Sequence, residues 1–176
     1  MNSDMTLDDV AHDCWRRLQQ GADDAAAPFR FPIVATQGLS HAGPPVLAAR
    51  IVVLRGADPT RREVVFHTDQ RSLKFAEIAA AARVTFVFYD AQARVQLRLV
   101  AQATAHIDDA IADAAWNAAA PTSRRAYRAK RGSGATSTPH SPGTLKKWAR
   151  EPTRLMTTLG GSNSRLSFAQ YCLWTG

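Results

Sequence analysis

The chain has 176 residues, of which 45% are hydrophobic and 21% charged, and it carries a formal net charge of +7. This balance excludes an intrinsically disordered chain and a membrane-spanning one, and the length suits a single domain with one sizeable core. The polar, acidic N-terminus is unlike a signal peptide, so we expect a bacterial cytoplasmic protein.

The first predicted element is a helix over Thr6–Gln20. Thr6 and Asp9 form the pattern of a capping box. Apolar residues then fall on one helical face, at Leu7, Val10, Ala11, Cys14 and Leu18. A small and polar break in the helical pattern follows over residues 21–27.

Five strands and one helix are predicted for a barrel-like core, which spans about residues 31–106. Runs rich in β-branched and aromatic residues mark the strands, at Phe31–Thr36, Val46–Leu54, Arg62–Thr68, Arg83–Tyr89 and Ala93–His106. The second strand is apolar on both sides apart from Arg50, which indicates burial of both faces, and a turn is predicted over 56–60. An Ala-rich helix over 72–82 separates the third strand from the fourth.

Polar and cationic side chains gather where the third strand gives way to this helix. Ser72 is placed to cap the helix, and Thr68, Arg71 and Lys74 surround the same end. Free N–H groups at a helix start, two hydroxyls and positive charge together suit a phosphate group. Arg50, inside an apolar strand, also needs an anion or a carboxylate. The alternative is that Arg50 ends a shorter strand and pairs with a surface acid.

The fifth strand alternates between apolar and polar residues. Its inner face is predicted to carry Val95, Leu97, Leu99, Ala101, Ala103 and Ala105. On the other face, Gln96 presents an amide that suits a heterocycle with donors and acceptors along one edge. The alternative is a plain solvent-exposed face, which is common in antiparallel sheets.

The C-terminal part is expected to be helical and irregular over 108–160 and to end in a strand over 166–174. Asp108 or Asp109 begins one helix, which continues to Trp116, and Pro121 begins another. Loops are predicted over 132–143 and 160–164, with a short helical segment over 145–150.

Neither a metal site nor a disulfide framework is predicted. The five histidines are scattered without ligand spacing, and the two cysteines, Cys14 and Cys172, stand near opposite ends of the chain. Both cysteines are expected to be buried small hydrophobes rather than reactive groups.

The central stretch contains three recognisable motifs: Arg50-Ile51-Val52-Val53-Leu54-Arg55, Phe66-His67-Thr68 with Ser72-Leu73-Lys74, and Val95-Gln96-Leu97-Arg98. In order and spacing they resemble the pyridoxamine 5'-phosphate oxidase-like flavoproteins, over about the middle third of the chain. The resemblance implies a mainly β, α+β fold, with one split β-barrel domain and flanking helices over residues 1–176. It also implies FMN as cofactor, bound between the two subunits of a homodimer.

The resemblance assigns individual residues to the FMN site. Arg50 and Lys74 correspond to a clamp on the FMN phosphate, and Thr68 and Ser72 to hydroxyl partners of the phosphate or the ribityl chain. Gln96 corresponds to an amide that hydrogen-bonds the flavin ring from the partner subunit. The full set implied for the cofactor is Arg50, Ile51, Val52, Val53, His67, Thr68, Ser72, Leu73, Lys74 and Gln96.

Within this set, some residues would contact the flavin through their backbone, and others differ in type from the residue that the family usually has. Val52 and Val53 would offer backbone groups to the edge of the flavin ring. His67 stands where the oxidases usually show Tyr. Leu73 stands where they have Arg, which removes one phosphate contact, and Arg71 lies close enough in sequence to replace it.

The substrate side of the resemblance is divergent. Arg55 stands where the oxidases have Lys near the substrate phosphate. Arg124 and Tyr127, with Ser123, echo the family's substrate-phosphate residues out of register. No general acid or base is assigned.

The sequence supports three hypotheses for function. The first is an FMN-dependent oxidoreductase related to the oxidases but with a divergent substrate side. The second is a flavin-binding or redox-sensing module without turnover. The third is a nucleic-acid-binding protein, favoured only by the net charge and by two basic clusters, at Arg124, Arg125, Arg128, Lys130 and Arg131 and at Lys146, Lys147, Arg150 and Arg154. Because the chain contains no nucleic-acid-binding motif, we rank this hypothesis last, and we expect no membrane partner.

Overall fold

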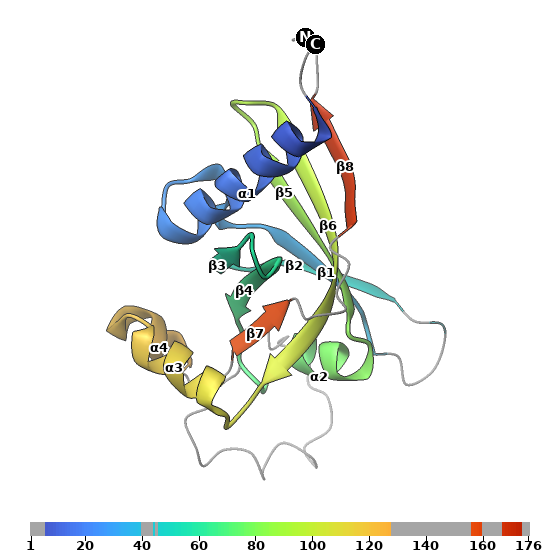
Figure 1. Ribbon diagram of the computed structural model, residues 1–176. Helices are drawn as coiled ribbons and strands as arrows, with labels where there is room; N and C mark the ends of the chain where they lie inside the picture. The colour runs from blue at the N-terminus through green and yellow to red at the C-terminus, as the bar shows by residue number, and fades with distance from the viewer. Residues whose placement is uncertain (1–5, 40–43, 45, 128–155, 160–166, 174–176) are drawn as a thin grey trace.

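The computed structural model describes residues 6–39, 44, 46–127, 156–159 and 167–173. The elements in chain order are α1 (Leu7–Asp23), the 3-10 turn η1 (Pro28–Arg30), β1 (Ile33–Gln37), β2 (Leu47–Ile51), β3 (Leu54–Asp58), β4 (Glu63–His67), α2 (Leu73–Ala80), β5 (Arg83–Asp90), β6 (Val95–His106), α3 (Ala110–Ala118), α4 (Pro121–Tyr127), β7 (Met156–Leu159) and β8 (Ser167–Leu173). Antiparallel pairing links the strands in the order β2-β1-β5-β6-β7-β4-β3, and β8 pairs with β6 (Figure 1).

The strand order explains the barrel. β2 and β3 stand at the two ends of the order, yet only Val52 and Val53 separate them in sequence, so the sheet curls back on itself. The long strand β6 is shared, because its first part pairs with β5 and β8 and its last residues pair with β7. The prediction of an α+β split β-barrel with flanking helices is therefore confirmed.

Aromatic and aliphatic side chains from the inner faces of the strands fill the core. Phe66, Phe86 and Phe88 are almost fully buried, with ring centroids 5.7 Å apart for Phe66 and Phe86 and 5.9 Å apart for Phe86 and Phe88. The predicted alternation of β6 holds from Val95 to Ala103, whose apolar residues are buried. This packing gives the sheet one inner and one outer face.

α1 begins as predicted and lies beside β3 and η1 (Figure 1). The capping box is present, since Thr6 N donates to Asp9 Oδ2 (2.9 Å) and Asp9 N donates to Thr6 Oγ1 (3.2 Å). The inner face of the helix buries Cys14, Trp15 and Leu18. Burial raises the pKa of the Cys14 thiol to about 11, as expected for a structural cysteine.

The helix continues past its predicted end at Gln20, and the predicted break at 21–27 is wrong in its first residues. Gly21 allows the helix to approach η1, because a Cβ there would lie 2.8 Å from the carbonyl carbon of Phe29. Arg30 then donates to the carbonyls of Gly21 and Ala22 and to that of Leu54 in β3 (3.1 Å). These bonds satisfy carbonyls of the last turn and hold it against the sheet.

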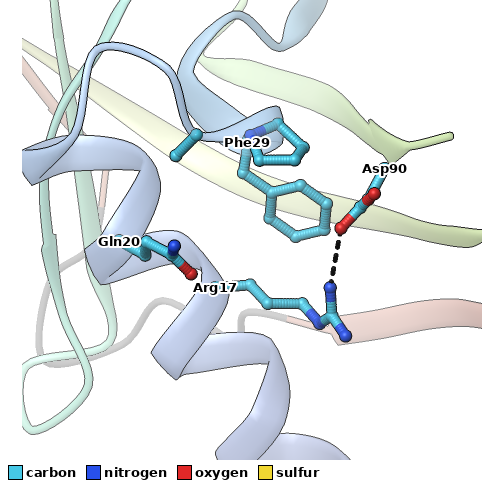
Figure 2. Close-up of a pocket in the computed structure, with 6 residues that line it drawn as sticks. Arg17, Gln20, Phe29 and Asp90 are labelled. Carbon is cyan, nitrogen blue, oxygen red and sulfur yellow. Dashed lines mark hydrogen bonds and ion pairs between the residues drawn. The ribbon is translucent and has the colours of Figure 1, made fainter. Parts of the chain in front are cut away.

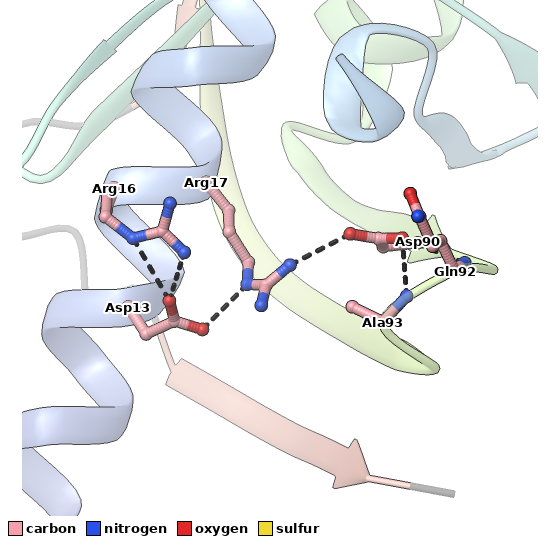
Figure 3. A network of polar contacts seen from close by, with 6 residues as sticks. All are labelled: Asp13, Arg16, Arg17, Asp90, Gln92 and Ala93. Atoms are coloured by element: carbon pink, nitrogen blue, oxygen red, sulfur yellow. Dashed lines mark hydrogen bonds and ion pairs between the residues drawn. The ribbon is translucent and has the colours of Figure 1, made fainter.

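Ion pairs tie α1 to the turn between β5 and β6. Arg17 Nε donates to Asp13 Oδ2 (2.7 Å), and Arg17 Nη1 donates to Asp90 Oδ2 (2.9 Å) at the end of β5 (Figure 3). Asp90 Oδ1 accepts from the backbone N–H groups of Gln92 and Ala93, which closes the turn. A pocket of about 20 Å³ beside Arg17 and Phe29 (Figure 2) has room for little more than a water molecule.

The predicted strand Val46–Leu54 is in fact two strands, and its predicted burial on both faces is wrong for a single chain. β2 ends at Ile51, because the next residue, Val52, is opposite Pro32 in the register and Pro32 has no N–H to donate in return for the bond from the Val52 N–H to the Pro32 carbonyl (2.9 Å). The Val52 side chain is buried. On the outer face of β2, Leu47 is 80% and Ile51 67% exposed. One chain thus leaves an apolar strand face uncovered.

The turn predicted over 56–60 lies later, over 59–62. β3 continues to Asp58, whose Oδ1 accepts from the N–H groups of Thr60 (2.8 Å) and Arg61 (3.0 Å). Arg62 closes the turn in the left-handed region, at φ 54°. The Asp side chain rather than Gly56 therefore makes the turn.

The prediction that 108–160 is only helical and irregular is wrong at its end. Asp109 caps α3 as expected, accepting from Ala112 N (2.8 Å), and Pro121 begins α4. The segment also contains β7, a four-residue strand that pairs with both β4 and β6. β8 confirms the last predicted strand, whereas the predicted segments 132–143 and 145–150, the loop 160–164 and the Cys172 side chain lie outside the described residues.

Candidate functional site

The centre of the predicted phosphate site is a hydrogen-bonded trio at the start of α2. Lys74 Nζ donates to Thr68 Oγ1 (2.7 Å), and Thr68 Oγ1 shares a hydrogen bond with Ser72 Oγ (3.1 Å). Both hydroxyls are buried, and Lys74 is partly buried. Residues that the sequence placed together because of spacing are thus in direct contact.

Ser72 occupies the N-cap position of α2, but the prediction that its side chain caps the helix is wrong. Its backbone is extended as a cap requires, yet its hydroxyl hydrogen-bonds Thr68 instead of a backbone N–H of α2. The first turn of α2 therefore presents its N–H groups without a side-chain cap beside the Lys74 ammonium.

Charges of both signs act on the Lys74 ammonium at this end of α2. Burial lowers the pKa of Lys74, and the nearby positive charge of Arg50 lowers it further, whereas Asp69 and Glu77 act in the opposite direction. A buried ammonium close to a second cation is destabilised unless an anion joins them. The donor set of Lys74, Arg50, two hydroxyls and a helix N-terminus therefore has the chemistry of a phosphate site.

Arg50 is held by two residues that the sequence analysis missed. Its Nη2 donates to Glu77 Oε2 (2.5 Å) in α2, and its Nη1 donates to Thr36 Oγ1 in β1. Thr36 Oγ1 in turn donates to Glu77 Oε2 (2.6 Å). The sequence does show a carboxylate, Glu77, next to Ile78 in the apolar stripe of the predicted helix. Its pairing with Arg50, however, depends on how α2 packs against β2, which no local pattern shows.

Arg71, expected to replace the missing arginine at position 73, is bound elsewhere. Its Nε and Nη2 donate to the buried Asp69 carboxylate at 2.9 Å and 2.6 Å. Hydrogen bonds from Arg71 hold the pKa of Asp69 below its usual value, although burial opposes them. Leu73 itself is 61% exposed at the first residue of α2.

Gln96 and Ile51 lie on the other face of the sheet from Arg50. The register aligns Arg50 with Val34, Val34 with Phe86 and Phe86 with Leu99, all on the inner side. Gln96 is opposite Tyr89, so it points outward, like Ile51, because side chains alternate along each strand. Within one chain, the structure therefore does not bring Gln96 together with the phosphate site.

The predicted backbone contacts at Val52 and Val53 are partly changed. The Val52 N–H is already bonded to the Pro32 carbonyl. The backbone groups that stay candidates for contact with the flavin ring are those of Val53 and the carbonyl of Val52. Both residues lie in the short connection between β2 and β3.

A second group of polar side chains surrounds Arg55 in β3. Its Nη2 lies 3.4 Å from Ser123 Oγ in α4, and its Nε is buried without a hydrogen-bond partner in the described part of the chain. Burial and the nearby Arg55 charge lower the pKa of His67 to about 4. Arg55, His67 and Ser123 are thus near one another, with an orphaned donor among them.

Arg124 and Tyr127 do not extend this group in the described structure. Arg124 donates to the carbonyls of Asn117 (2.9 Å) and Ala119 (2.8 Å), and its guanidinium lies 5.7 Å from the Trp116 ring centroid. It therefore closes the C-terminal end of α3. The side chain of Tyr127 lies outside the described residues.

The described residues also provide information on metal sites and on membrane-spanning helices. They contain no cluster of three or more histidine, cysteine, aspartate and glutamate side chains arranged to hold a metal ion. None of their helices combines the length and apolarity needed to span a bilayer.

Comparison with known proteins gives the fold and family. A pyridoxamine 5'-phosphate oxidase-related, FMN-binding protein from Nostoc punctiforme PCC 73102 matches with a TM-score of 0.62 at 18% identity, over 92% of this chain and 83% of that one. PhzG from Burkholderia lata 383, in complex with tetrahydrophenazine-1-carboxylic acid, matches with a TM-score of 0.54 at 14% identity, over 75% of this chain and 65% of that one. General Stress Protein 26 from Bacillus anthracis str. Sterne matches with a TM-score of 0.51 at 9% identity, over 92% and 98%.

At these identities the solved structures establish the shared fold alone, and no curated protein matches the sequence significantly. The sequence family is established separately, by the model for the pyridoxamine 5'-phosphate oxidase FMN-binding domain, which matches residues 12–107. The match covers more than half of the chain and includes the strands and α2 that form the phosphate site. The chain belongs to the family of the pyridoxamine 5'-phosphate oxidase FMN-binding domain.

Proposed function

We propose that the protein binds FMN and that the FMN phosphate is held by Arg50, Lys74, Thr68, Ser72 and the N-terminus of α2. The observation that carries the proposal is the Lys74–Thr68–Ser72 trio beside Arg50, a partly buried cationic cluster with an uncapped helix start. A phosphate dianion would compensate both cations and accept from both hydroxyls. The family model for an FMN-binding domain supports the same cofactor.

We also propose that the functional unit is a homodimer formed through the outer face of the sheet. Ile51, Ile33 and Val87 are aligned across β2, β1 and β5, and Ile51 and Ile33 are exposed apolar residues. An uncovered apolar row of this kind is typical of an interaction surface. Gln96 lies on the same outer face, so a partner chain is where its amide would meet a flavin.

The chemistry that we propose is oxidoreduction with a divergent substrate side. Bound FMN would supply the redox chemistry, while the chain binds and orients it. Arg55, with its orphaned Nε beside His67 and Ser123, is the candidate contact for an anionic substrate. Because Arg124 is used at the end of α3, we expect turnover of pyridoxamine 5'-phosphate below about 1 per second.

A flavin-binding or redox-sensing module is the second candidate. The engagement of Arg124 with the α3 carbonyls favours it, since this leaves fewer cations for a substrate. Anaerobic reduction of the FMN-loaded protein by NADH or NADPH, followed by addition of candidate acceptors, separates the two functions. Repeated turnover supports the oxidoreductase, and a single reduction without turnover supports the module.

The proposal as a whole is tested by the absorption spectrum of the purified protein. We expect flavin absorption bands and release of FMN, rather than riboflavin or FAD, on denaturation. A colourless protein that takes up no FMN during reconstitution would overturn it.

A further inference from the structure

The environment of Arg50 contains a feature that cofactor binding alone does not explain. Glu77 is only 4% exposed, and its carboxylate lies beside the two cations of the phosphate site. A carboxylate buried next to a phosphate dianion repels it, so its presence requires a reason.

The hydrogen bonds supply that reason. Glu77 Oε2 accepts from Arg50 Nη2 (2.5 Å) and from Thr36 Oγ1 (2.6 Å), and Thr36 Oγ1 accepts from Arg50 Nη1. Two of the guanidinium's N–H donors are therefore fixed to α2 and β1, which leaves the remaining donors in a set direction. Arg50 itself is on β2, a strand in which every residue is exposed or only partly buried.

We infer that Glu77, supported by Thr36, is the positioning residue that aims Arg50 at the ligand phosphate in the FMN site. The inference rests on the proposed function and adds to it a residue that acts through Arg50 and touches no ligand. The Glu77 carboxylate repels the phosphate to some extent, but it also holds the Arg50 guanidinium in place before the ligand binds. A guanidinium held in this way can donate to two phosphate oxygens at once.

The test compares Glu77→Ala with Glu77→Gln by fluorescence titration with FMN and with riboflavin, which lacks the phosphate. Glu77→Ala removes both acceptor bonds, so its FMN affinity should fall about tenfold while riboflavin affinity stays within about threefold. Glu77→Gln keeps an amide oxygen that accepts the same two bonds, and it should bind FMN within about threefold of wild type. Thermal unfolding of each variant establishes that it is folded.

Glu63→Ala is the matched control, because it also removes one carboxylate that pairs with an arginine, at 3.2 Å from Arg61 Nε, outside the phosphate site. It should leave both flavin affinities unchanged. Equal losses for both flavins in Glu77→Ala would mean that Glu77 only maintains the scaffold, and unchanged or tighter FMN binding would mean that it does not position Arg50. A Gln variant as weak as the Ala variant would also overturn the inference. A wild-type chain without FMN affinity would instead contradict the proposed function itself, and the inference with it.

Discussion

Lys74 is the residue on which the account of the phosphate site depends most. It combines burial, a nearby cation and a hydrogen bond to a buried hydroxyl. Lys74→Ala should therefore weaken FMN binding about ten- to hundred-fold while leaving riboflavin binding nearly unchanged. Fluorescence titration with both flavins measures the difference.

Gln96→Ala is the control for this experiment, because the amide is proposed to meet the ring that both flavins share. It should weaken FMN and riboflavin by similar factors. Equal losses of both flavins in Lys74→Ala would place the phosphate elsewhere in the protein.

His67 gives a prediction for pH. Its pKa in the folded protein, about 4, is below the value of about 6.5 for an unfolded chain, because burial and Arg55 disfavour the imidazolium. Between these values the unfolded state binds the additional proton, so His67 lowers stability as the pH falls from about 6.5 toward 4. Above about pH 6.5 it has no such effect.

Urea unfolding of wild type and His67→Gln at about pH 7.5 and about pH 5 measures this contribution. Wild type should lose up to about 2 kcal/mol more than the variant between the two conditions. The same pH dependence in both proteins would contradict a buried, neutral His67.

For individual residues of the site, the sequence predicted contacts between near neighbours in the chain better than contacts between segments that folding brings together. Thr68, Ser72 and Lys74 come from one short stretch, so spacing was enough to place them together. Glu77 and Thr36 meet Arg50 only through the packing of α2 against β1 and β2, and no local pattern reports that pairing. Ser72 was misread as a side-chain cap because its hydroxyl has a competing partner in Thr68.

The position of α1 depends on the close approach of Gly21 to η1. A Cβ at Gly21 would lie within 3 Å of three Phe29 atoms, two of them in the backbone. Gly21→Ala should therefore push the end of α1 from the sheet and lower the free energy of unfolding by about 1–3 kcal/mol.

Gly56→Ala provides the comparison, since a Cβ there would contact only the Val65 side chain, at 3.4 Å. It should lower the free energy of unfolding clearly less than Gly21→Ala does, when both variants are measured by urea unfolding. Equal stabilities of the two variants would mean that the α1–η1 contact is not tight.

Elements with a strong local pattern were predictable, and elements defined by their partners were not. The capping box of α1 and the alternation of β6 are visible in sequence, and both are present. The break between β2 and β3 contains no glycine or proline of its own, since Pro32 in the facing segment, which has no N–H to donate to Val52, ends the pairing. β7 has only four residues, and pairing with β4 and β6 defines it.

For the whole molecule, the uncovered face of β2 is the main observation in favour of a dimer. Ile51→Glu should place a charge in the proposed interface and weaken self-association about tenfold or more. Leu7→Glu is the control, because Leu7 is also an exposed apolar residue but lies on α1. Sedimentation across a concentration range measures both, and a wild-type protein that binds FMN as a strict monomer would refute the proposal.

Equilibrium titration of the purified wild-type protein with FMN and with riboflavin measures whether this chain holds FMN by its phosphate. We expect saturable quenching of flavin fluorescence, with one flavin bound per chain and an affinity for FMN at least about tenfold above that for riboflavin. Equal affinities for the two flavins, or no saturable binding of FMN, would contradict this expectation.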